Sequence, residues 1–166
     1  MAKIGIFYGS TTGNAEGFAN RIGERFEGAE IFDISDASPA DFEPFDVVLM
    51  GTSSWGEGEL QDDWDSFADN LDEIDFGGKT VGFFGCGDQD GHGDTFCDGM
   101  GVLHDKVAPK AKKVVGAWPA EGYEYENSMS VRDGKFVGLA IDEDNQDDLT
   151  DGRIETWAAQ VKAEIG

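Results

Sequence analysis

The chain has 166 residues, the length of one ordinary domain, and 39% of them are hydrophobic, which is enough for a buried core. Its 35 acidic residues outnumber its 12 lysines and arginines, and the net charge of −23 argues against binding nucleic acid or anionic membrane surfaces. Because Cys86 and Cys97 are too few for a disulfide scaffold and no long apolar segment stands out, we expect a cytoplasmic protein with free thiols.

Short apolar runs alternate with helical patterns along the chain. The predicted strands are 4–8, 30–34, 47–50, 80–84 and 113–116, with 136–141 continuing the last one after an excursion. Apolar residues recur at helical spacing over 15–26, 64–71, 100–107 and 154–165. This alternation predicts an α/β fold in which helices cover both faces of a mostly parallel sheet. We expect residues 1–166 to form a single domain and the acidic run 142–148 to be a solvated loop.

The segment after the first predicted strand is suited to binding a phosphate. It reads Gly-Ser-Thr-Thr-Gly-Asn-Ala over residues 9–15 and leads into a predicted helix, so hydroxyls and free backbone N–H groups meet at a helix N-terminus. The segment has neither the Gly-Lys-Ser/Thr of a Walker loop nor the glycine spacing of a dinucleotide fingerprint. Taken alone, it is equally compatible with an ordinary Ser/Thr helix cap.

Two further segments have the composition of ligand-binding loops. Trp55 stands among small residues after the third predicted strand, where an aromatic ring is well placed to stack on a planar ligand, although it could also fold back under its own loop. Four glycines, at positions 85, 87, 91 and 93, follow the fourth strand, which indicates a backbone that closely approaches another group. In parallel sheets, ligands bind beyond the carboxyl ends of the strands.

These three segments together resemble the flavodoxins, in particular their long-chain branch. Residues 10–14 resemble the phosphate loop of that family, 55–61 its first flavin loop and 87–91 its second. Residues 118–125, 133–140 and 142–146 resemble the long-chain insertion and the segment that follows it. The resemblance runs in register from about Lys3 to Ile165. It implies a doubly wound five-stranded parallel sheet in the order 2-1-3-4-5, with the fifth strand interrupted by an insertion.

The resemblance also implies a low-potential one-electron carrier with one non-covalently bound FMN and with neither catalytic nor metal-binding residues. The expected cofactor-binding residues are Ser10, Thr11, Thr12, Gly13, Asn14 and Ala15 at the phosphate, Ser53, Ser54, Trp55, Gly56, Glu57 and Gly58 on the inner side of the ring, Cys86, Gly87, Asp88, His92 and Cys97 around its edges and outer face, and Asp144 at the ribityl chain. Ala15, His92 and Cys97 depart from the family pattern, which usually has Thr, a stacking Tyr and, in long-chain relatives, a polar side chain there.

Two other functions share this fold. A phosphorylated receiver domain needs an Asp at the end of the third strand, where this chain has Gly51 and Thr52. An FMN-dependent quinone reductase-like enzyme remains the alternative, although the flavin loops are short and no substrate-binding element is added. The net charge of −23 requires redox partners that present an electropositive docking face. The resemblance allows a ferredoxin–NADP reductase, a pyruvate oxidoreductase or a nitrogenase reductase as such partners, and we expect a monomer.

The remaining charged and titratable residues have simpler interpretations. We expect a solvated acidic face made of Asp62, Asp63, Asp65, Asp69, Asp72 and Asp75 rather than a metal site. His104 lies in a helical stretch and is interpreted as structural. The lysines at positions 106, 110, 112 and 113 cluster near a helix C-terminus, where positive charge complements the helix dipole.

Overall fold

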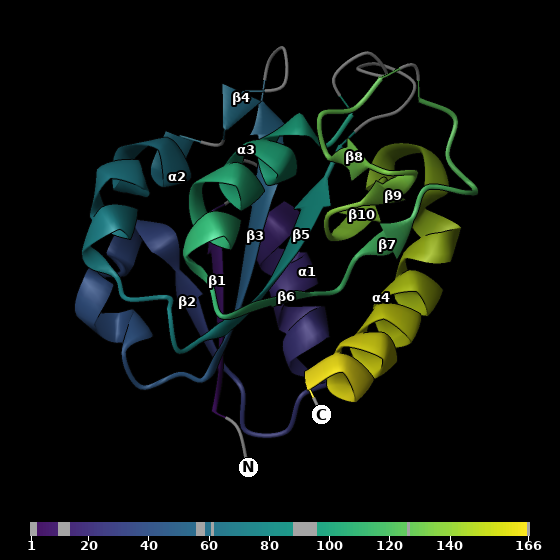
Figure 1. The fold of residues 1–166 in the computed structure, drawn as a ribbon. Helices are drawn as coiled ribbons and strands as arrows, with labels where there is room; N and C mark the ends of the chain where they lie inside the picture. The colour runs from purple at the N-terminus through teal and green to yellow at the C-terminus, as the bar shows by residue number, and fades with distance from the viewer. Residues whose placement is uncertain are drawn as a thin grey trace.

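The computed structural model describes residues 3–9, 14–55, 59–60, 62–87, 96–125 and 127–165. Its central sheet is parallel and has the order β10-β5-β3-β1-β2 (Figure 1). These strands are β1 (Ile4–Gly9), β2 (Glu30–Asp33), β3 (Val47–Trp55), β5 (Thr80–Cys86) and β10 (Leu139–Ile141). A short strand, β6 (Lys113–Val115), pairs with the first half of β5, and β10 pairs with its end. The predicted order 2-1-3-4-5 with an interrupted fifth strand is therefore confirmed.

The insertion between β6 and β10 forms a small antiparallel sheet of its own. It consists of β7 (Trp118–Pro119), β8 (Val131–Arg132) and β9 (Lys135–Phe136), in the order β7-β9-β8. The prediction that 136–141 forms one strand was wrong, because Phe136 pairs with Trp118 in the small sheet, whereas Leu139 pairs with Phe84 in the central one. The chain changes sheets at Gly138, where an added Cβ would lie 2.1 Å from the backbone oxygen of Phe83.

Helices cover both faces of the central sheet, as the apolar strands require. The α-helices are α1 (Asn14–Gly23), α2 (Asp62–Phe67), α3 (Asp98–Val107) and α4 (Glu143–Ile165). The 3-10 helices are η1 (Ile34–Asp36), η2 (Pro39–Phe42), η3 (Ala68–Glu73) and η5 (Ala108–Lys110). Neighbouring residues of β5 identify the two faces, because the Phe84 ring meets Trp157 of α4, whereas Gly85 lies against Met100 of α3. Helix α1 contacts α4.

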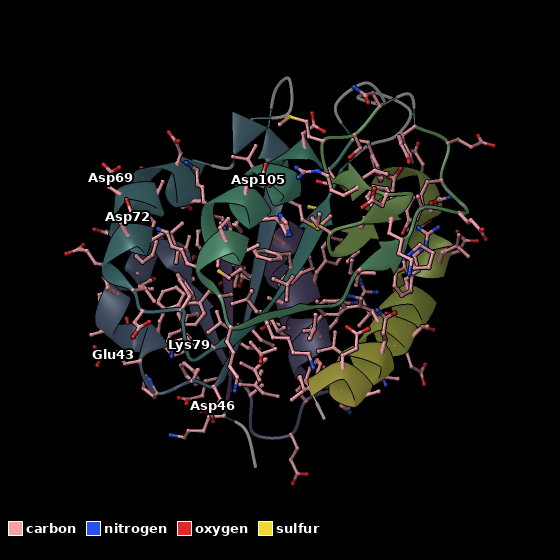
Figure 2. The ribbon with its side chains drawn as sticks, viewed as in Figure 1. Glu43, Asp46, Asp69, Asp72, Lys79 and Asp105 are labelled. Carbon is pink, nitrogen blue, oxygen red and sulfur yellow. The ribbon has the colours of Figure 1, made fainter. Side chains whose placement is uncertain are left out.

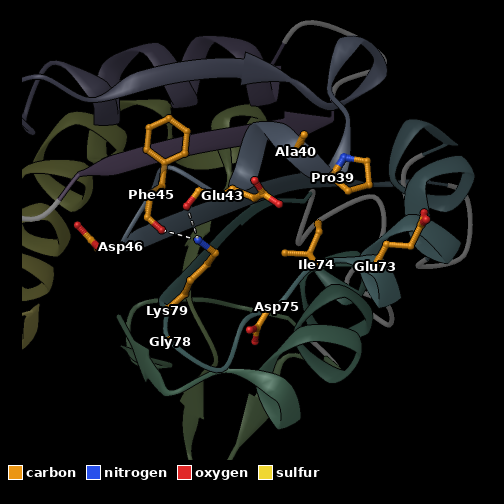
Figure 3. Close-up of a pocket in the computed structure, with 10 residues that line it drawn as sticks. All are labelled: Pro39, Ala40, Glu43, Phe45, Asp46, Glu73, Ile74, Asp75, Gly78 and Lys79. Carbon is orange, nitrogen blue, oxygen red and sulfur yellow. Dashed lines mark hydrogen bonds between the residues drawn. The ribbon is translucent and has the colours of Figure 1, made fainter.

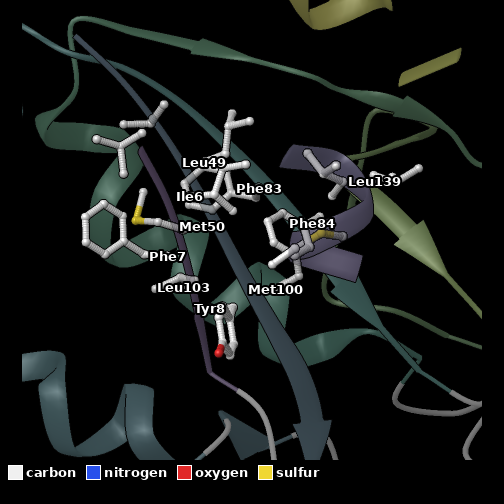
Figure 4. Packing of buried hydrophobic residues seen from close by; sticks show 14 of the residues in the cluster. Ile6, Phe7, Tyr8, Leu49, Met50, Phe83, Phe84, Met100, Leu103 and Leu139 are labelled. Carbon is white, nitrogen blue, oxygen red and sulfur yellow. The ribbon is translucent and has the colours of Figure 1, made fainter. Parts of the chain in front are cut away.

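The core is built from the strands that the apolar runs predict. Ile6, Leu49 and Phe83 come from three adjacent strands and are completely buried (Figure 4). Burial of each such side chain stabilises a fold by about 1.5–3 kcal/mol. Gly51 is needed for this packing, because an added Cβ would lie 2.0 Å from the ring of Phe84 on the neighbouring strand. A glycine in the middle of a strand here makes room for an aromatic ring.

The acidic run 142–148 is helical, so its interpretation as a solvated loop was wrong. Helix α4 begins at Glu143, and the completely buried Asp142 caps it by accepting hydrogen bonds from the backbone N–H of Asn145 (3.0 Å) and from its side-chain amide (2.9 Å). Acidic residues in a first helical turn are favourable because they complement the helix dipole. The helix is interrupted at Gln146, whose φ of −134° is not helical and whose amide donates to the carbonyl of Gly122.

Candidate functional site

The carboxyl ends of the central strands meet at one edge of the sheet. Gly9 at the end of β1 is paired with Thr52 of β3, and Cys86 at the end of β5 is paired with both Ser53 of β3 and Ile141 of β10. These positions lie at the upper edge of the sheet in Figure 1. Ligands of doubly wound sheets bind outside such an edge, at the point where the strand order reverses, which here lies between β1 and β3.

The N-terminus of α1 lies at this edge. Ser10, Thr11, Thr12 and Gly13, which connect β1 to the helix, are outside the described residues. Asn14 begins the helix and Ala15 is 1% exposed, so the first turn is anchored in the protein. A helix N-terminus carries a partial positive charge and free N–H groups, both of which suit an anion. Arg21, in the last turn of α1, is paired with Asp151 at 2.7 Å.

Strand β3 is longer than the sequence pattern predicts. It continues to Trp55 because Ser54 and Trp55 pair with the antiparallel strand β4 (Glu59–Leu60). The predicted end of this strand at Met50 was therefore wrong, and Ser53, Ser54 and Trp55 belong to a strand that extends past the sheet edge. Gly56, Glu57 and Gly58 lie outside the described residues. The buried Trp64 fixes this strand from α2, since its indole N–H donates to the Gly51 carbonyl at 2.7 Å.

The residues before and after the segment that follows β5 lie close together. Cys86 ends the strand and Gly87 follows it, and an added Cβ on Gly87 would lie 2.9 Å from the backbone nitrogen of Cys97. Cys97 is completely buried and has a φ of 54°, in the left-handed region. Both cysteines are free thiols, as expected, and burial raises the pKa of the Cys97 thiol well above its usual value. Asp88 and His92 lie outside the described residues.

The remaining expected contact, Asp144, lies in the first turn of α4, just beyond the end of β10. Four elements thus bring Asn14, Ser53, Cys86 and Asp144 to the same edge, although these residues are far apart in the sequence. Among the described residues, the buried carboxylates next to this edge are Asp98 and Asp142, and both accept hydrogen bonds from neighbouring N–H groups.

The sequence and the fold were compared with those of known proteins. The family model described as flavodoxin matches residues 6–157. The chain belongs to the flavodoxin family. It is 48% identical to a flavodoxin of Picosynechococcus sp., with 100% of this chain and 99% of the relative covered, and 46% identical to flavodoxin 1 of Salmonella typhimurium, with 99% and 96% covered. Among solved structures, Fusobacterium nucleatum flavodoxin bound to flavin mononucleotide superimposes with a TM-score of 0.93 at 37% identity, covering 99% of each chain.

A cavity of about 440 Å³ lies at the opposite, amino-terminal edge of this flavodoxin's sheet (Figure 3). Carboxylates of Glu43, Asp46, Glu73 and Asp75 line it, together with Lys79. The Lys79 ammonium is not directed at an anion that could bind in the cavity, because it donates to the carbonyls of Phe42, Glu43 and Phe45 at 2.9, 3.2 and 2.6 Å. Four carboxylates repel a phosphate, so the carboxyl edge and not this cavity is the candidate cofactor site.

Two residues of the expected acidic face, Asp69 and Asp72, can be placed in the structure. Asp69 and Asp72 lie at the surface of η3 (Figure 2), and a hydrogen bond from Lys110 holds the pKa of Asp72 below its usual value. In the part of the chain that the structure describes, no group of three or more His, Cys, Asp or Glu side chains is arranged to hold a metal ion.

His104 packs edge-on against Phe83, which agrees with a structural role. The described helices are all too short or too polar to cross a membrane.

One set of contacts at the candidate site has no signal in the sequence. Residues 127–130 of the insertion are hydrogen-bonded to residues 96–98, where the segment after β5 returns to the sheet. Serines in a loop and a buried Asp at a helix start are common for local reasons, so neither predicts a contact across about 30 positions of sequence. These contacts join the insertion directly to the candidate site.

Proposed function

We propose that this flavodoxin carries single electrons between redox enzymes and holds one FMN non-covalently at the carboxyl edge of the central sheet. The observation that supports this most strongly is the meeting of the strand ends with the N-terminus of α1 at the switch point between β1 and β3. Flavodoxin is itself a standard example of ligand binding at such a switch point. The Fusobacterium nucleatum relative, which has the same fold, contains flavin mononucleotide.

The residues proposed to hold the cofactor are those that the family resemblance indicates. They are Ser10, Thr11, Thr12, Gly13, Asn14 and Ala15 for the phosphate, Ser53, Ser54, Trp55, Gly56, Glu57 and Gly58 for the inner side of the ring, Cys86, Gly87, Asp88, His92 and Cys97 for its edges and outer face, and Asp144 for the ribityl chain. We further propose that the chain is a single domain of the long-chain branch, since the insertion between β6 and β10 carries its own small sheet.

The protein contributes binding and electrostatics, and FMN, when bound, supplies the one-electron chemistry. The phosphate loop supplies no positively charged side chain to the phosphate, because the sequence contains no Lys or Arg between Ser10 and Asn20. Hydroxyls, backbone N–H groups and the dipole of α1 take that role. The Cys97 thiol stays protonated at neutral pH because burial raises its pKa, so no thiolate forms beside the ring. The net charge of −23 disfavours added negative charge and so favours a low potential.

Flavodoxins are electron-transfer proteins and not enzymes, so the reductase-like alternative is not favoured. A carrier has to meet its partners transiently, and its acidic surface requires an electropositive face on each of them. We propose partners of the ferredoxin–NADP reductase, pyruvate oxidoreductase or nitrogenase reductase kind, and a monomeric carrier. The two free thiols support a reducing compartment, the cytoplasm.

Apoprotein titrated with FMN and with riboflavin tests how the cofactor is held. Riboflavin lacks the phosphate, and each charged hydrogen bond contributes about 1.5–3 kcal/mol, so we expect riboflavin to bind at least about tenfold more weakly. Quenching of flavin fluorescence in phosphate-free buffer measures both affinities. One FMN per chain is the expected stoichiometry. Equal affinities for the two flavins would show that the N-terminus of α1 is not the phosphate site.

A further inference from the structure

The two ends of the segment that follows β5 form a narrow neck, defined here as Cys86, Gly87, Phe96 and Cys97. The backbone N–H of Gly87 donates to the Ile141 carbonyl at 3.0 Å, which fixes the outgoing end to β10. The returning end lies so close that a Cβ on Gly87 would meet the Cys97 nitrogen at 2.9 Å. The position of the returning end is therefore decided by what holds Phe96 and Cys97 from the other side.

Residues 127–130 of the insertion hold the returning end of the neck. The Ser128 hydroxyl donates to the Phe96 carbonyl, and the Ser130 hydroxyl donates to the Cys97 carbonyl at 2.5 Å. Both serines are buried, with exposures of 8% and 0%. Two further bonds complete the contact, from the Phe96 N–H to the Asn127 carbonyl at 3.2 Å and from the Met129 N–H to a carboxylate oxygen of Asp98 at 2.7 Å. The small sheet lies beside this end of β5 (Figure 1).

The backbone of Cys97 shows why such a clamp is needed. Its φ of 54° and ψ of 25° place it in the left-handed region, which a residue with a side chain adopts only when its surroundings impose it. The φ and ψ bonds of Cys97 lie between the carbonyls of Phe96 and Cys97, and the two serine hydroxyls donate to these two carbonyls. Helix α3 begins at the next residue, Asp98, so the same conformation sets the direction in which the chain enters the helix.

The insertion is attached to the rest of the protein by other contacts as well. Arg132 forms a two-pronged pair with Asp105 of α3 at 3.1 and 3.0 Å, which holds the pKa of Asp105 below its usual value. Tyr123 donates to the Ala140 carbonyl at 2.5 Å, and its ring packs against Phe136. Removal of the two serine hydroxyls therefore loosens the neck while the insertion itself stays in place.

We propose that Ser128 and Ser130 are positioning residues for the flavin: they fix the neck of the segment proposed to cover the outer face and edge of the ring. The inference rests on the proposed FMN site. An unclamped neck has to be ordered when the cofactor binds, and this ordering lowers the affinity. The ring of bound FMN also becomes less precisely oriented.

The test compares Ser128→Ala, Ser130→Ala and the double variant with the wild-type holoprotein. We expect the double variant to bind FMN about tenfold more weakly and each single variant about threefold more weakly, because each lost hydrogen bond contributes a fraction of that factor. The visible circular dichroism of bound FMN, which reports the orientation of the ring, should decrease. Hydrogen exchange of the Phe96 and Cys97 amides should become faster, while that of Val48 in the core stays unchanged.

Two matched variants separate positioning from simple destabilisation. Asp105→Asn removes the charge pair with Arg132 but keeps the hydrogen bond from Arg132 to the Met129 carbonyl (2.8 Å), so it should change the FMN affinity by less than about twofold. Ser128→Thr retains the hydroxyl at the more exposed position and should preserve affinity and circular dichroism. If the double variant does not fold, the single variants decide. Wild-type affinity in the serine variants, or an equal loss in Asp105→Asn, would overturn the inference. Failure of the wild type to bind FMN would instead contradict the proposed function.

Discussion

Replacing Gly138 with alanine is expected to lower the free energy of unfolding by about 3 kcal/mol, because an overpacked site in a core must push neighbouring elements apart. The new methyl group would lie 2.1 Å from the Phe83 oxygen and 2.6 Å from its carbonyl carbon. These are backbone atoms of β5, so no side-chain rotation relieves the clash. The displaced strand is β10, whose Ile141 pairs with Cys86 at the candidate site, and FMN binding should weaken as well.

Gly152→Ala is the matched control for this substitution. Gly152 lies in α4 and is exposed, and no atom lies within 4 Å of an added Cβ. An exposed helical glycine costs up to about 1 kcal/mol relative to alanine, so this variant should be more stable than the wild type. Urea unfolding of both apoproteins, followed by circular dichroism, measures the difference. If Gly138→Ala and Gly152→Ala have the same stability, the close approach of Gly138 to β5 is wrong.

Replacing Lys79 with methionine is expected to lower the free energy of unfolding by about 2–3 kcal/mol, because hydrogen bonds from a charged donor are lost while their acceptors stay buried. Lys79 is 8% exposed, and its ammonium connects the carbonyls of Phe42, Glu43 and Phe45 at the amino-terminal edge of the sheet (Figure 3). Burial lowers the pKa of Lys79, and the nearby carboxylates of Asp46, Asp75 and Glu43 partly oppose this effect.

Lys112→Met serves as the control for Lys79, since it removes the same charge from an exposed position. We expect this control to change stability by less than about 0.5 kcal/mol. Thermal and urea unfolding of the two variants give the comparison, and FMN affinity should be retained in both because Lys79 lies at the edge opposite the candidate cofactor site. Equal stabilities of the two methionine variants would mean that the Lys79 ammonium does not hold these three carbonyls.

Much of the fold could be predicted because its strands are continuous apolar runs. Residues 5–8 and 81–84 are buried on both sides, and such runs are readily recognised as strands of a covered parallel sheet. The boundaries that were missed depend on tertiary partners. Ser53 is in a strand because it pairs with Cys86 of β5, and Ser54 and Trp55 because they pair with β4. Glu59 and Leu60 are too few for a strand pattern of their own.

The start of α4 illustrates a different limit. The acidic residues 142–148 have the composition of a loop, yet capping by Asp142 and the complementary helix dipole make them helical. The cofactor site is proposed from a resemblance to a family, since its three loops are weak signals one by one. The contacts of Ser128 and Ser130 with the neck could not be predicted at all, because they join segments about 30 positions apart and follow no periodic pattern.

The location of the cofactor is most directly tested by titrating isotope-labelled apoprotein with FMN and recording amide chemical shifts. We expect one saturable site, with large shifts for Gly9, Asn14 and Gly87 at the carboxyl edge. The amides of Gly78 and Lys79, which line the cavity at the opposite edge, should hardly move. Shifts concentrated around Lys79, or no saturable binding of FMN, would contradict cofactor binding at the carboxyl edge.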